Sequence, residues 1–440
     1  MIPYPAYKTT NLPWLPKIPE HWGIVRCKQI FRPIDVRSEK GEEQLLSVSE
    51  RYGVVKREQA NVTMFKAASY EGYKLCWPDD LAINSLWAWS YGLGFSPYHG
   101  IISTAYSVFR LKDKTKCLPR FYDYLVRSKD FHWELRVRSK GLWKSRYQLS
   151  DDAFLAAPIL DVPIAEQEQI VRYLDSMTAK INKLIRAKKK QIALLQEQRQ
   201  AIINRAVTKG LDTNVEMKDS GIDWLGKIPK HWNTCKVKHL CKMQSGDNLT
   251  SEVIQETGDY PVYGANGQRG FYHTYNQDGN CLLVGRQGAL CGNVHVVFGK
   301  IWATDHAVVT IPTKRALVSY LYYLLGAMNL NQYALETAAQ PGLSVSMIQN
   351  LPTLLAPLNE QKTIAAYLDK QCTIFDACID KMKKSIDALT EYKNSLISSV
   401  VTGQIDVRNI NIEPFDFSDL SAEIEEEALT EDQPKQEMEE

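Results

Sequence analysis

The chain has 440 residues, 44% hydrophobic and 24% charged, which is typical of a globular protein with two or three domains. It has no run of about 18 apolar residues and no signal-peptide pattern at its N-terminus, so we expect a cytoplasmic protein without a membrane span. Its nine cysteines are scattered and form no Cys-x-x-Cys pair, which argues against a disulfide framework and a zinc site.

Charge is distributed unevenly along the chain, although the formal net charge is only +2. Residues 411–440 contain 12 acidic residues and one basic residue, which leaves a net charge of +13 on residues 1–410. A basic body suits a polyanionic partner, although a basic surface without such a partner is an alternative. We expect the acidic tail to be disordered.

After residues 1–12, which we expect to form a loose arm, comes a lead segment, Trp14–Trp22, that recurs at Trp224–Trp232. Eight of the 15 positions that start at Trp14 match those that start at Trp224. The prolines disfavour a helix, so we predict an extended segment whose tryptophans anchor it to a core. We interpret His21 and His231 as polar caps rather than metal ligands.

Each lead segment is followed by a globular stretch of short strands and turns. In residues 23–160 we predict strands at 44–48, 81–85, 105–109 and 159–162 and a helix at 119–129. Residues 233–356 repeat the plan with a strand at 281–284, a glycine turn after it and a helix at 317–330. Each half is therefore a globular α/β unit whose content differs from that of the other.

A long helix is predicted after each globular unit, from Pro163 to about Thr208 and from Pro357 to about Thr402. Over 50 positions aligned at an offset of 194, 17 residues are identical, which indicates an internal duplication. Apolar residues recur at steps of three and four, as in a coiled coil, and we predict that the helices pack antiparallel; two ordinary core helices are the alternative. The apolar stripe is Ile170, Leu174, Met177, Ile181, Leu184, Ile192, Leu195, Ile202 and Ala206 in the first copy, and Ile364, Leu368, Phe375, Cys378, Met382, Ile386, Leu389, Leu396 and Val400 in the second.

The predicted fold class is α/β (α+β), with two globular domains alternating with two long helices that pair as an antiparallel coiled coil in a pseudo-two-fold repeat. The expected domains are 1–162 (lead segment and first globular domain), 163–210 (long helix), 211–356 (linker, second lead segment and second globular domain), 357–408 (long helix) and 409–440 (tail).

Catalytic signatures are missing from the sequence. It contains no phosphate-binding loop, no dinucleotide-binding glycine pattern, no metal-ligand spacing among the eight histidines and no Asn/Asp-Pro-Pro-Tyr stretch. Asp79-Asp80 lacks the Glu-x-Lys that a nuclease centre would need. Asp305 and His306 could form half of an acid–base pair, but we predict a satisfied buried pair.

Polar and aromatic residues cluster in the predicted turns of both globular units. Arg, Asn, Gln and Ser can hydrogen-bond base edges, and Lys and Arg can hold phosphates, so we predict DNA-binding residues here; ordinary surface loops are the alternative. The candidates are Trp89, Tyr91, Ser96, Tyr98, Arg136, Arg138, Lys140, Lys144 and Arg146 in the first unit, and Tyr263, Asn266, Gln268, Arg269, Arg286, Gln287 and Gln340 in the second.

Taken together, these features resemble the specificity (S) subunit of type I restriction-modification systems, up to about Arg408. The resemblance is carried by the two Ile-Pro-x-x-Trp stretches that begin at Ile18 and Ile228, the Pro-x-x-Glu-Gln starts at Pro163 and Pro357, and the long helices behind them. Three globular stretches are also similar to recurrent stretches of that family's target-recognition domains. They are Tyr260-Pro261-Val262-Tyr263-Gly264-Ala265-Asn266-Gly267, Val284-Gly285-Arg286-Gln287-Gly288-Ala289 and Gly100-Ile101-Ile102-Ser103-Thr104-Ala105-Tyr106.

The resemblance implies a subunit without catalytic activity or cofactor of its own, in which each globular domain reads one half of a split double-stranded DNA target. The helices would set the spacer and hold two modification subunits, which carry S-adenosylmethionine and methylate adenine N6. Restriction subunits, which use ATP and Mg, would join them. Two alternatives remain: an enzyme that acts alone on DNA, and a coiled-coil scaffold that binds only proteins.

Overall fold

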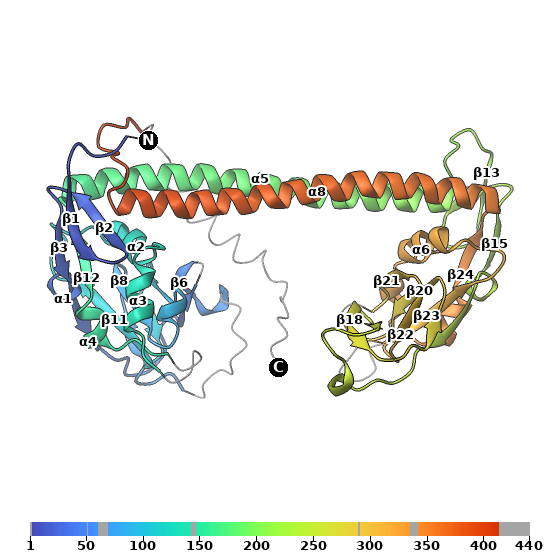
Figure 1. Cartoon of the computed structure of the whole chain (residues 1–440), viewed down its shortest axis with the longest axis horizontal. Helices are drawn as coiled ribbons and strands as arrows, with labels where there is room; N and C mark the ends of the chain where they lie inside the picture. The colour runs from blue at the N-terminus through green and yellow to red at the C-terminus, as the bar shows by residue number, and fades with distance from the viewer. Residues whose placement is uncertain are drawn as a thin grey trace. The chain divides into compact units, whose positions relative to one another are not determined.

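The structure is a computed structural model that describes residues 2–50, 52–59, 69–141, 147–288, 291–334 and 342–412. The chain forms two compact units (Figure 1). Unit 1 takes the chain up to Ala187 and from Lys384 onward, and unit 2 is Lys188–Lys383. The two long helices, α5 (Ile164–Lys209) and α8 (Leu358–Val401), each contribute to both units. Each compact unit includes part of both long helices, so the units do not coincide with the domains predicted from the sequence. Those domain boundaries therefore stay predictions.

Each unit is built on a four-stranded antiparallel sheet, with strand order β4-β11-β8-β9 in unit 1 and β16-β23-β20-β21 in unit 2. The central strands β8 and β20 are buried almost throughout, which explains why they read as short apolar runs. The strand bounds are β4 (Phe31–Ile34), β8 (Asp80–Asn84), β9 (Leu93–Phe95), β11 (Tyr106–Leu111), β16 (Cys241–Ser245), β20 (Cys281–Gly285), β21 (Val294–Val297) and β23 (Ala307–Pro312).

Around these sheets the two units share further elements. Each lead segment contributes the second strand of a hairpin, and a strand pair joins the start of each globular part to its end. The shared elements are β1 (Tyr7–Leu12) with β2 (Leu15–Pro19), β13 (Met217–Asp219) with β14 (Lys227–Pro229), β3 (Gly23–Arg26) with β12 (Pro158–Asp161), β15 (Asn233–Lys236) with β24 (Pro352–Leu355), and the helices α2 (Pro119–Val126), α6 (Val318–Ala327), α4 (Asp151–Leu155) and α7 (Val345–Asn350). The predicted loose arm over residues 1–12 is wrong, because β1 pairs with β2 and Tyr4 is buried.

The remaining elements differ between the units. Unit 2 has a second sheet of order β18-β17-β22-β19, whereas unit 1 has two separate strand pairs and an extra helix. These elements are β5 (Leu46–Ser49), β6 (Gly53–Lys56), β7 (Lys74–Cys76), β10 (Gly100–Ile102), α1 (Cys27–Ile30), α3 (His132–Arg138), η1 (Arg57–Gln59) and η2 (Ala88–Ser90) in unit 1, and β17 (Tyr260–Gly264), β18 (Gly267–Tyr272), β19 (Gln277–Asp278), β22 (Lys300–Ala303), η4 (Val237–His239), η5 (Ser251–Val253) and η6 (Leu330–Tyr333) in unit 2.

The long helices pack antiparallel, as predicted. In unit 1, Lys393 Nζ of α8 donates to Asn182 Oδ1 of α5 at 3.1 Å, and in unit 2, Arg199 Nε of α5 lies 3.4 Å from Asp376 Oδ1 of α8. Unit 1 thus pairs the first half of α5 with the second half of α8, and unit 2 pairs the second half of α5 with the first half of α8, as antiparallel packing requires. Both contacts stand beside buried seam residues, among them Ile181 and Leu396 in unit 1 and Ile203 and Leu368 in unit 2.

Two residues of the predicted apolar stripe lie outside the seam. Leu184 is 53% exposed and Cys378 is exposed, whereas their neighbours Ile185 and Ile379 are buried. A step of four from Ile181 to Ile185, and from Phe375 to Ile379, keeps the side chain on the buried face, whereas a step of three turns it toward solvent at these positions. The two predicted positions were therefore wrong by one residue.

A buried tryptophan of each lead segment fixes the beginning of one long helix. Trp22 Nε1 donates to Glu166 Oε2 at 3.0 Å, and Trp232 Nε1 donates to Glu360 Oε2 at the same distance. The other carboxylate oxygens contact His21 and His231 at 2.5 and 2.7 Å. The histidines, interpreted from the sequence as polar caps, thus contact carboxylates in the first turn of each long helix.

The same tryptophans pack against the end of the other long helix. Gly403 follows α8 with a φ of +73°, and a Cβ there would come within 2.9 Å of Trp22 and 2.5 Å of Pro19. Gly210 follows α5, also with a φ of +73°, and faces Trp232 at 3.4 Å. Glycine is needed at both helix ends because the backbone is left-handed and the approach is close.

The glutamine of each Pro-x-x-Glu-Gln start ties a long helix to the globular part of its unit. Gln361 is buried; its amide oxygen accepts from the Leu317 N–H, and its amide nitrogen donates to the carbonyls of Arg315 and Ala356, at 2.8–2.9 Å. Gln167 makes the same three contacts with Leu118, Lys116 and Val162. Each glutamine therefore satisfies backbone groups at the start of α2 or α6.

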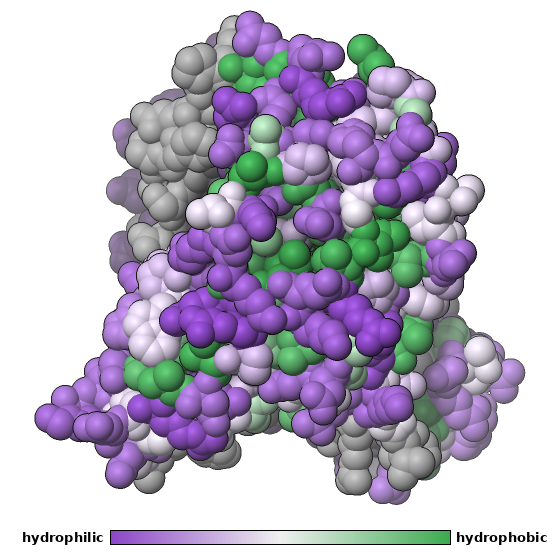
Figure 2. Space-filling model, turned by 90° about the vertical axis from the view of Figure 1, so that its left-hand side faces the viewer, coloured by the Kyte–Doolittle hydropathy of each residue, from purple (hydrophilic) through white to green (hydrophobic). Residues whose placement is uncertain are grey.

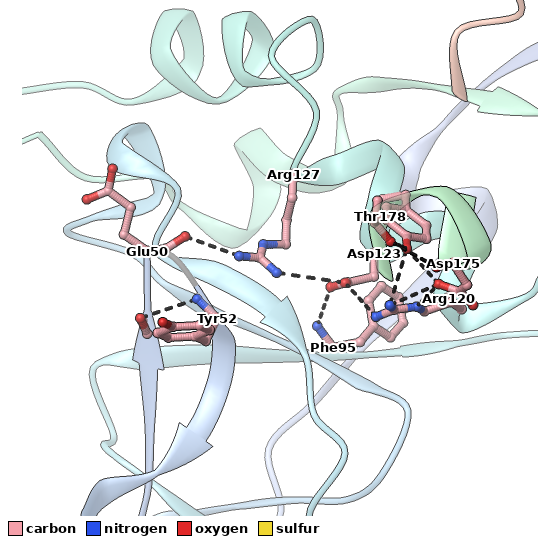
Figure 3. A network of polar contacts seen from close by, with 10 residues as sticks. Glu50, Tyr52, Phe95, Arg120, Asp123, Arg127, Asp175 and Thr178 are labelled. Carbon is pink, nitrogen blue, oxygen red and sulfur yellow. Dashed lines mark hydrogen bonds and ion pairs between the residues drawn. The ribbon is translucent and has the colours of Figure 1, made fainter. Parts of the chain in front are cut away.

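A polar network in unit 1 continues this attachment (Figure 3). Asp175 of α5 accepts from Tyr124 at 2.6 Å and from Arg120 at 3.0 Å, and Arg120 also lies 3.8 Å from Asp123. Asp123 in turn accepts from the Phe95 N–H at 3.0 Å. In unit 2 the equivalent pair is Tyr323 and Asp369, at 2.7 Å. Burial and then the neighbouring Asp369 raise the pKa of Tyr323 well above 10, so its hydroxyl stays a donor.

Candidate nucleic-acid interface

A β-hairpin presents four of the predicted residues in unit 2. β17 and β18 pair as far as Gly264 and Gly267, which leaves Ala265 and Asn266 as a two-residue turn. Asn266 is exposed at the tip, and Gln268 and Arg269 are exposed on β18. Tyr263 is half-buried on β17, and its carbonyl accepts from the Thr304 N–H at 2.9 Å. The turn-rich stretch therefore presents accessible amide and guanidinium groups, and DNA binding by these residues stays a prediction.

Arg286 lies in the loop after β20, next to the loop that Thr304 begins. Its N–H donates to the His306 carbonyl at 2.9 Å, and its Nη1 donates to Ser245 Oγ at 3.3 Å. The bond between Thr304 and Tyr263 links this group to the hairpin. These contacts bring Tyr263 of β17 to the same region as Arg286 and His306, which lie in two loops, and Gln287 is exposed beside Arg286.

In unit 1, an aromatic stack lies between η2 and α3. The rings of Tyr91 and His132 are 3.9 Å apart and nearly parallel, and His132 Nε2 lies 2.5 Å from the carbonyl of Trp89. Tyr91 has a φ of +61°, which is unusual for a residue with a side chain, so the stack holds a constrained backbone. Arg136 is exposed one turn after His132. These contacts bring the predicted Trp89, Tyr91 and Arg136 together.

The other predicted residues of unit 1 are not part of the Tyr91–His132 stack. Ser96 is buried, and its Oγ bonds the backbone of Tyr98, which is half-buried under Lys56. Arg138 Nε is bound to Glu134 at 2.6 Å, whereas Lys140 is exposed. Ser96 and Arg138 thus have structural partners within the fold. Lys144, Arg146 and Gln340 lie outside the described residues.

The predicted buried pair of Asp305 and His306 is wrong. Their side chains are 42% and 45% exposed, and the shortest distance between the carboxylate and the imidazole is 4.0 Å. The pair lies in the loop between β22 and β23. The apolar sequence of β23 predicts that the strand is buried, but it does not predict that the loop before the strand is buried.

Three residues near the candidate groups were not singled out. Ser245 and His132 contact Arg286 and Tyr91, which lie 41 residues away from each along the chain. His295 lies near Gly267, and its Nε2 is buried without a hydrogen-bond partner among the described residues. No local sequence signal marks these residues, because tertiary packing brings them to their neighbours: His132 through the contact of α3 with η2, and Ser245 and His295 through the strands of unit 2.

Acidification is expected to destabilise unit 1 through His132. Burial lowers the pKa of His132 below 6.5. The hydrogen bond to the Trp89 carbonyl raises this pKa, and the positive charge of Arg136 lowers it further. The unfolded chain then binds a proton more readily than the folded chain, so stability is lost as the pH falls through about 6.5. Urea denaturation at about pH 7.5 and pH 5.5 should show a smaller loss of stability for His132→Gln than for the wild type. The exposed His273→Gln serves as the control and should behave as the wild type; equal losses in all three proteins would contradict the assignment.

The candidate surfaces offer hydrogen-bonding and cationic groups. In the part of the chain that the structure describes, no group of three or more His, Cys, Asp or Glu side chains could hold a metal ion. Over the same residues, no helix is both long and apolar enough to cross a membrane. At the unit 1 end, small apolar patches alternate with hydrophilic side chains (Figure 2). Such surfaces can bind a polar, anionic partner.

The chain is similar to proteins of one family. Residues 229–391 match the family model described as the type I restriction modification DNA specificity domain. The specificity subunit of the type I restriction enzyme EcoprrI from Escherichia coli is 39% identical over 160 residues, which cover 36% of this chain and 38% of that protein. That of MjaVIII from Methanocaldococcus jannaschii is 23% identical over 428 residues, which cover 90% of this chain and 95% of that protein.

A solved structure, described as the basis of complex assembly and conformational transition in the type I R-M system, shares the fold. It matches with a TM-score of 0.66 at 16% identity, over 88% of this chain and 99% of that chain. The matching family model lies over the second globular unit and its long helix, and the similarity to the second relative extends over nearly the whole chain. The second globular unit and its long helix are therefore similar to the DNA specificity domain of type I restriction-modification systems, and the relatives named above are specificity subunits of such systems.

Proposed function

We propose that the chain recognises a two-part sequence in double-stranded DNA, with one half read by the globular part of each unit. The observation that carries this proposal is a duplicated frame with unlike polar surfaces. The sheets, lead segments and glutamine contacts are the same in both units, whereas the polar surfaces differ: unit 1 carries the Tyr91 stack, and in unit 2 the β17–β18 hairpin belongs to a four-stranded sheet, while the β5–β6 pair of unit 1 is a separate two-stranded sheet. Two units with the same scaffold but different polar surfaces are suited to bind two different half-sites.

The catalytic steps are assigned to partner subunits in this proposal. Two modification subunits would carry S-adenosylmethionine and methylate adenine N6, and restriction subunits would use ATP and Mg. This chain would act in the cytoplasm as a non-catalytic subunit with no cofactor of its own. The family resemblance supports the assignment. Transfer of a methyl group to DNA by the purified chain alone would contradict it.

Salt dependence of binding tests DNA recognition directly. A protein that neutralises several phosphates loses affinity for DNA steeply as salt rises, because bound counterions are released. We expect the chain, assembled with its modification subunits, to bind duplex DNA with such a dependence. A coiled-coil scaffold that binds only proteins would show no salt-dependent DNA affinity, and that result would support the alternative.

Single substitutions on the unit 2 surface should affect one half-site. Asn266→Ala and Arg286→Ala each remove a group that can make a bidentate contact with a base, which is worth about 1–3 kcal/mol. We expect about 5- to 150-fold weaker binding of the cognate duplex and relaxed preference in one half-site only. Arg205→Ala, an exposed arginine on α5, is the control and should leave both half-site preferences unchanged. Selection of binding sites from random duplexes measures both; relaxation of both half-sites would refute the assignment.

A further inference from the structure

An open groove in unit 1 has an apolar surface that the described residues leave uncovered. It has a volume of about 550 Å³ and lies between the β1–β2 turn, α3 and β12. Leu12, Pro13, Trp133 and Val137 contribute its apolar lining. Trp133 is 39% exposed and Val137 is 57% exposed. Burial of two such side chains by another segment would be favourable.

The rim of this groove is positively charged. Glu134 is buried in the lining, and its two oxygens are already bound by Arg138 Nε and Trp14 Nε1, at 2.6 and 2.8 Å. Lys140 is exposed in the lining and Arg136 is exposed on the same helix, and neither has an ion pair within the described ranges. Residues 110–146, which include this region, contain 12 basic and four acidic residues. An occupant should therefore combine apolar side chains with carboxylates.

We infer that the stretch 415–424 of the chain's own C-terminal tail docks in this groove. Its sequence is Phe-Asp-Phe-Ser-Asp-Leu-Ser-Ala-Glu-Ile, in which Phe417, Leu420 and Ile424 are spaced by three and four residues among acidic ones. The apolar side chains match the lining, and Asp416, Asp419 and Glu423 match the rim. The tail thus has both chemical features that the groove selects.

The end of the described chain lies within reach of the groove. The Ile410 carbonyl accepts from Gln169 Nε2 at 2.8 Å, and Tyr7 Oη at the start of β1 donates to the Gln404 carbonyl at 3.5 Å. From Tyr7, β1 extends to Leu12 in the groove, over about 17 Å. Arg408 lies 4.8 Å from the centre of the Tyr4 ring, so the described chain ends close to the start of β1, and the five residues from Ile412 to Phe417 can span about 17 Å. A tethered segment this close has an effective concentration of about a millimolar, so a weak contact suffices.

Docking would have a consequence for DNA binding, and this consequence rests on the proposed function. The docked carboxylates would lie over Arg136 and Lys140, two of the predicted DNA-binding residues. The tail would then compete with DNA phosphates for the same cations. An undocked tail would free this surface.

Site-specific photocrosslinking in the full chain tests docking without DNA. With p-benzoylphenylalanine in place of Phe417, illumination should link the tail to peptides that contain residues 12–13 or 133–140. The same group in place of Met438, outside the docking stretch, is the control and should give no preferred crosslink. Val137→Asp should abolish the Phe417 crosslink, and salt should weaken it. Crosslinks from position 417 that avoid these peptides, or that survive Val137→Asp, would overturn the inference.

DNA affinity then separates docking from competition. In the full chain, the double substitution Phe417→Asp/Leu420→Asp should release the tail and raise DNA affinity about fivefold to tenfold, whereas Leu429→Asp, outside the stretch, should not. If the crosslink forms and affinity does not change, docking stands and competition is refuted. If neither variant nor wild type binds DNA, the proposed function fails while the crosslink still decides on docking.

Discussion

A shorter pair of long helices is expected to recognise a DNA target with a shorter spacer and unchanged half-sites. Ile185–Gln191 lie between Asn182 and Arg199 along α5, and Lys384–Thr390 lie between their partners Asp376 and Lys393 along α8. Deletion of both stretches removes seven residues from each helix, or about 10 Å. Seven residues are nearly two whole turns, so the faces of each helix keep their phase to within about 20°. We expect a spacer about three base pairs shorter, because base pairs stack at about 3.4 Å.

Selection of binding sites by the assembled complex measures this result. The matched control is a deletion of the seven residues from α5 alone, which breaks the antiparallel register and should abolish specific binding. A double deletion that retains the original spacer, or that changes the half-site sequences, would show that the helices do not set the distance.

Gln361→Leu is expected to destabilise unit 2 by about 3–5 kcal/mol. The substitution leaves the Leu317 N–H and the carbonyls of Arg315 and Ala356 without their partner, and each unsatisfied buried group costs about 1–3 kcal/mol. The effect is large because one amide serves three backbone groups, and a leucine of similar size offers none of these bonds. Urea denaturation followed by circular dichroism measures it.

Gln167→Leu should produce a similar loss in unit 1, since it makes the equivalent three contacts. Gln196→Leu is the matched control: this glutamine is exposed on α5, and its substitution should change stability by less than about 0.5 kcal/mol. A loss below about 1 kcal/mol for Gln361→Leu would mean that water replaces the amide and that the contact does not hold the helix to the globular part.

The long helices and lead segments could be predicted from the sequence because their signals are local. A repeated apolar period, a proline before each helix and paired Ile-Pro-x-x-Trp stretches suffice to place them. The identical Glu and Gln of each helix start were visible, but their partners were not. Gln361 contacts Leu317 and Arg315 more than 40 residues away, and no pattern in the sequence indicates which backbone groups it satisfies.

Short elements without an apolar period of their own were missed. The strand Tyr7–Leu12 has no apolar alternation and forms because it pairs with β2, and the seven-residue helix His132–Arg138 contains the buried Glu134, whose partners include Trp14. The hairpin that presents Asn266 was predictable, since Gly-Ala-Asn-Gly favours a tight turn. The approach of Arg286 to His306 follows from the sheet register, which a single sequence does not specify.

The central proposal is that one chain reads two separate half-sites. Its most direct test is the methylation pattern of DNA from cells that carry this chain together with its modification subunits. Sequencing that detects N6-methyladenine should find a split motif, with two unlike half-sites and a gap of fixed length. A single contiguous motif, or half-sites separated by a variable gap, would contradict the account.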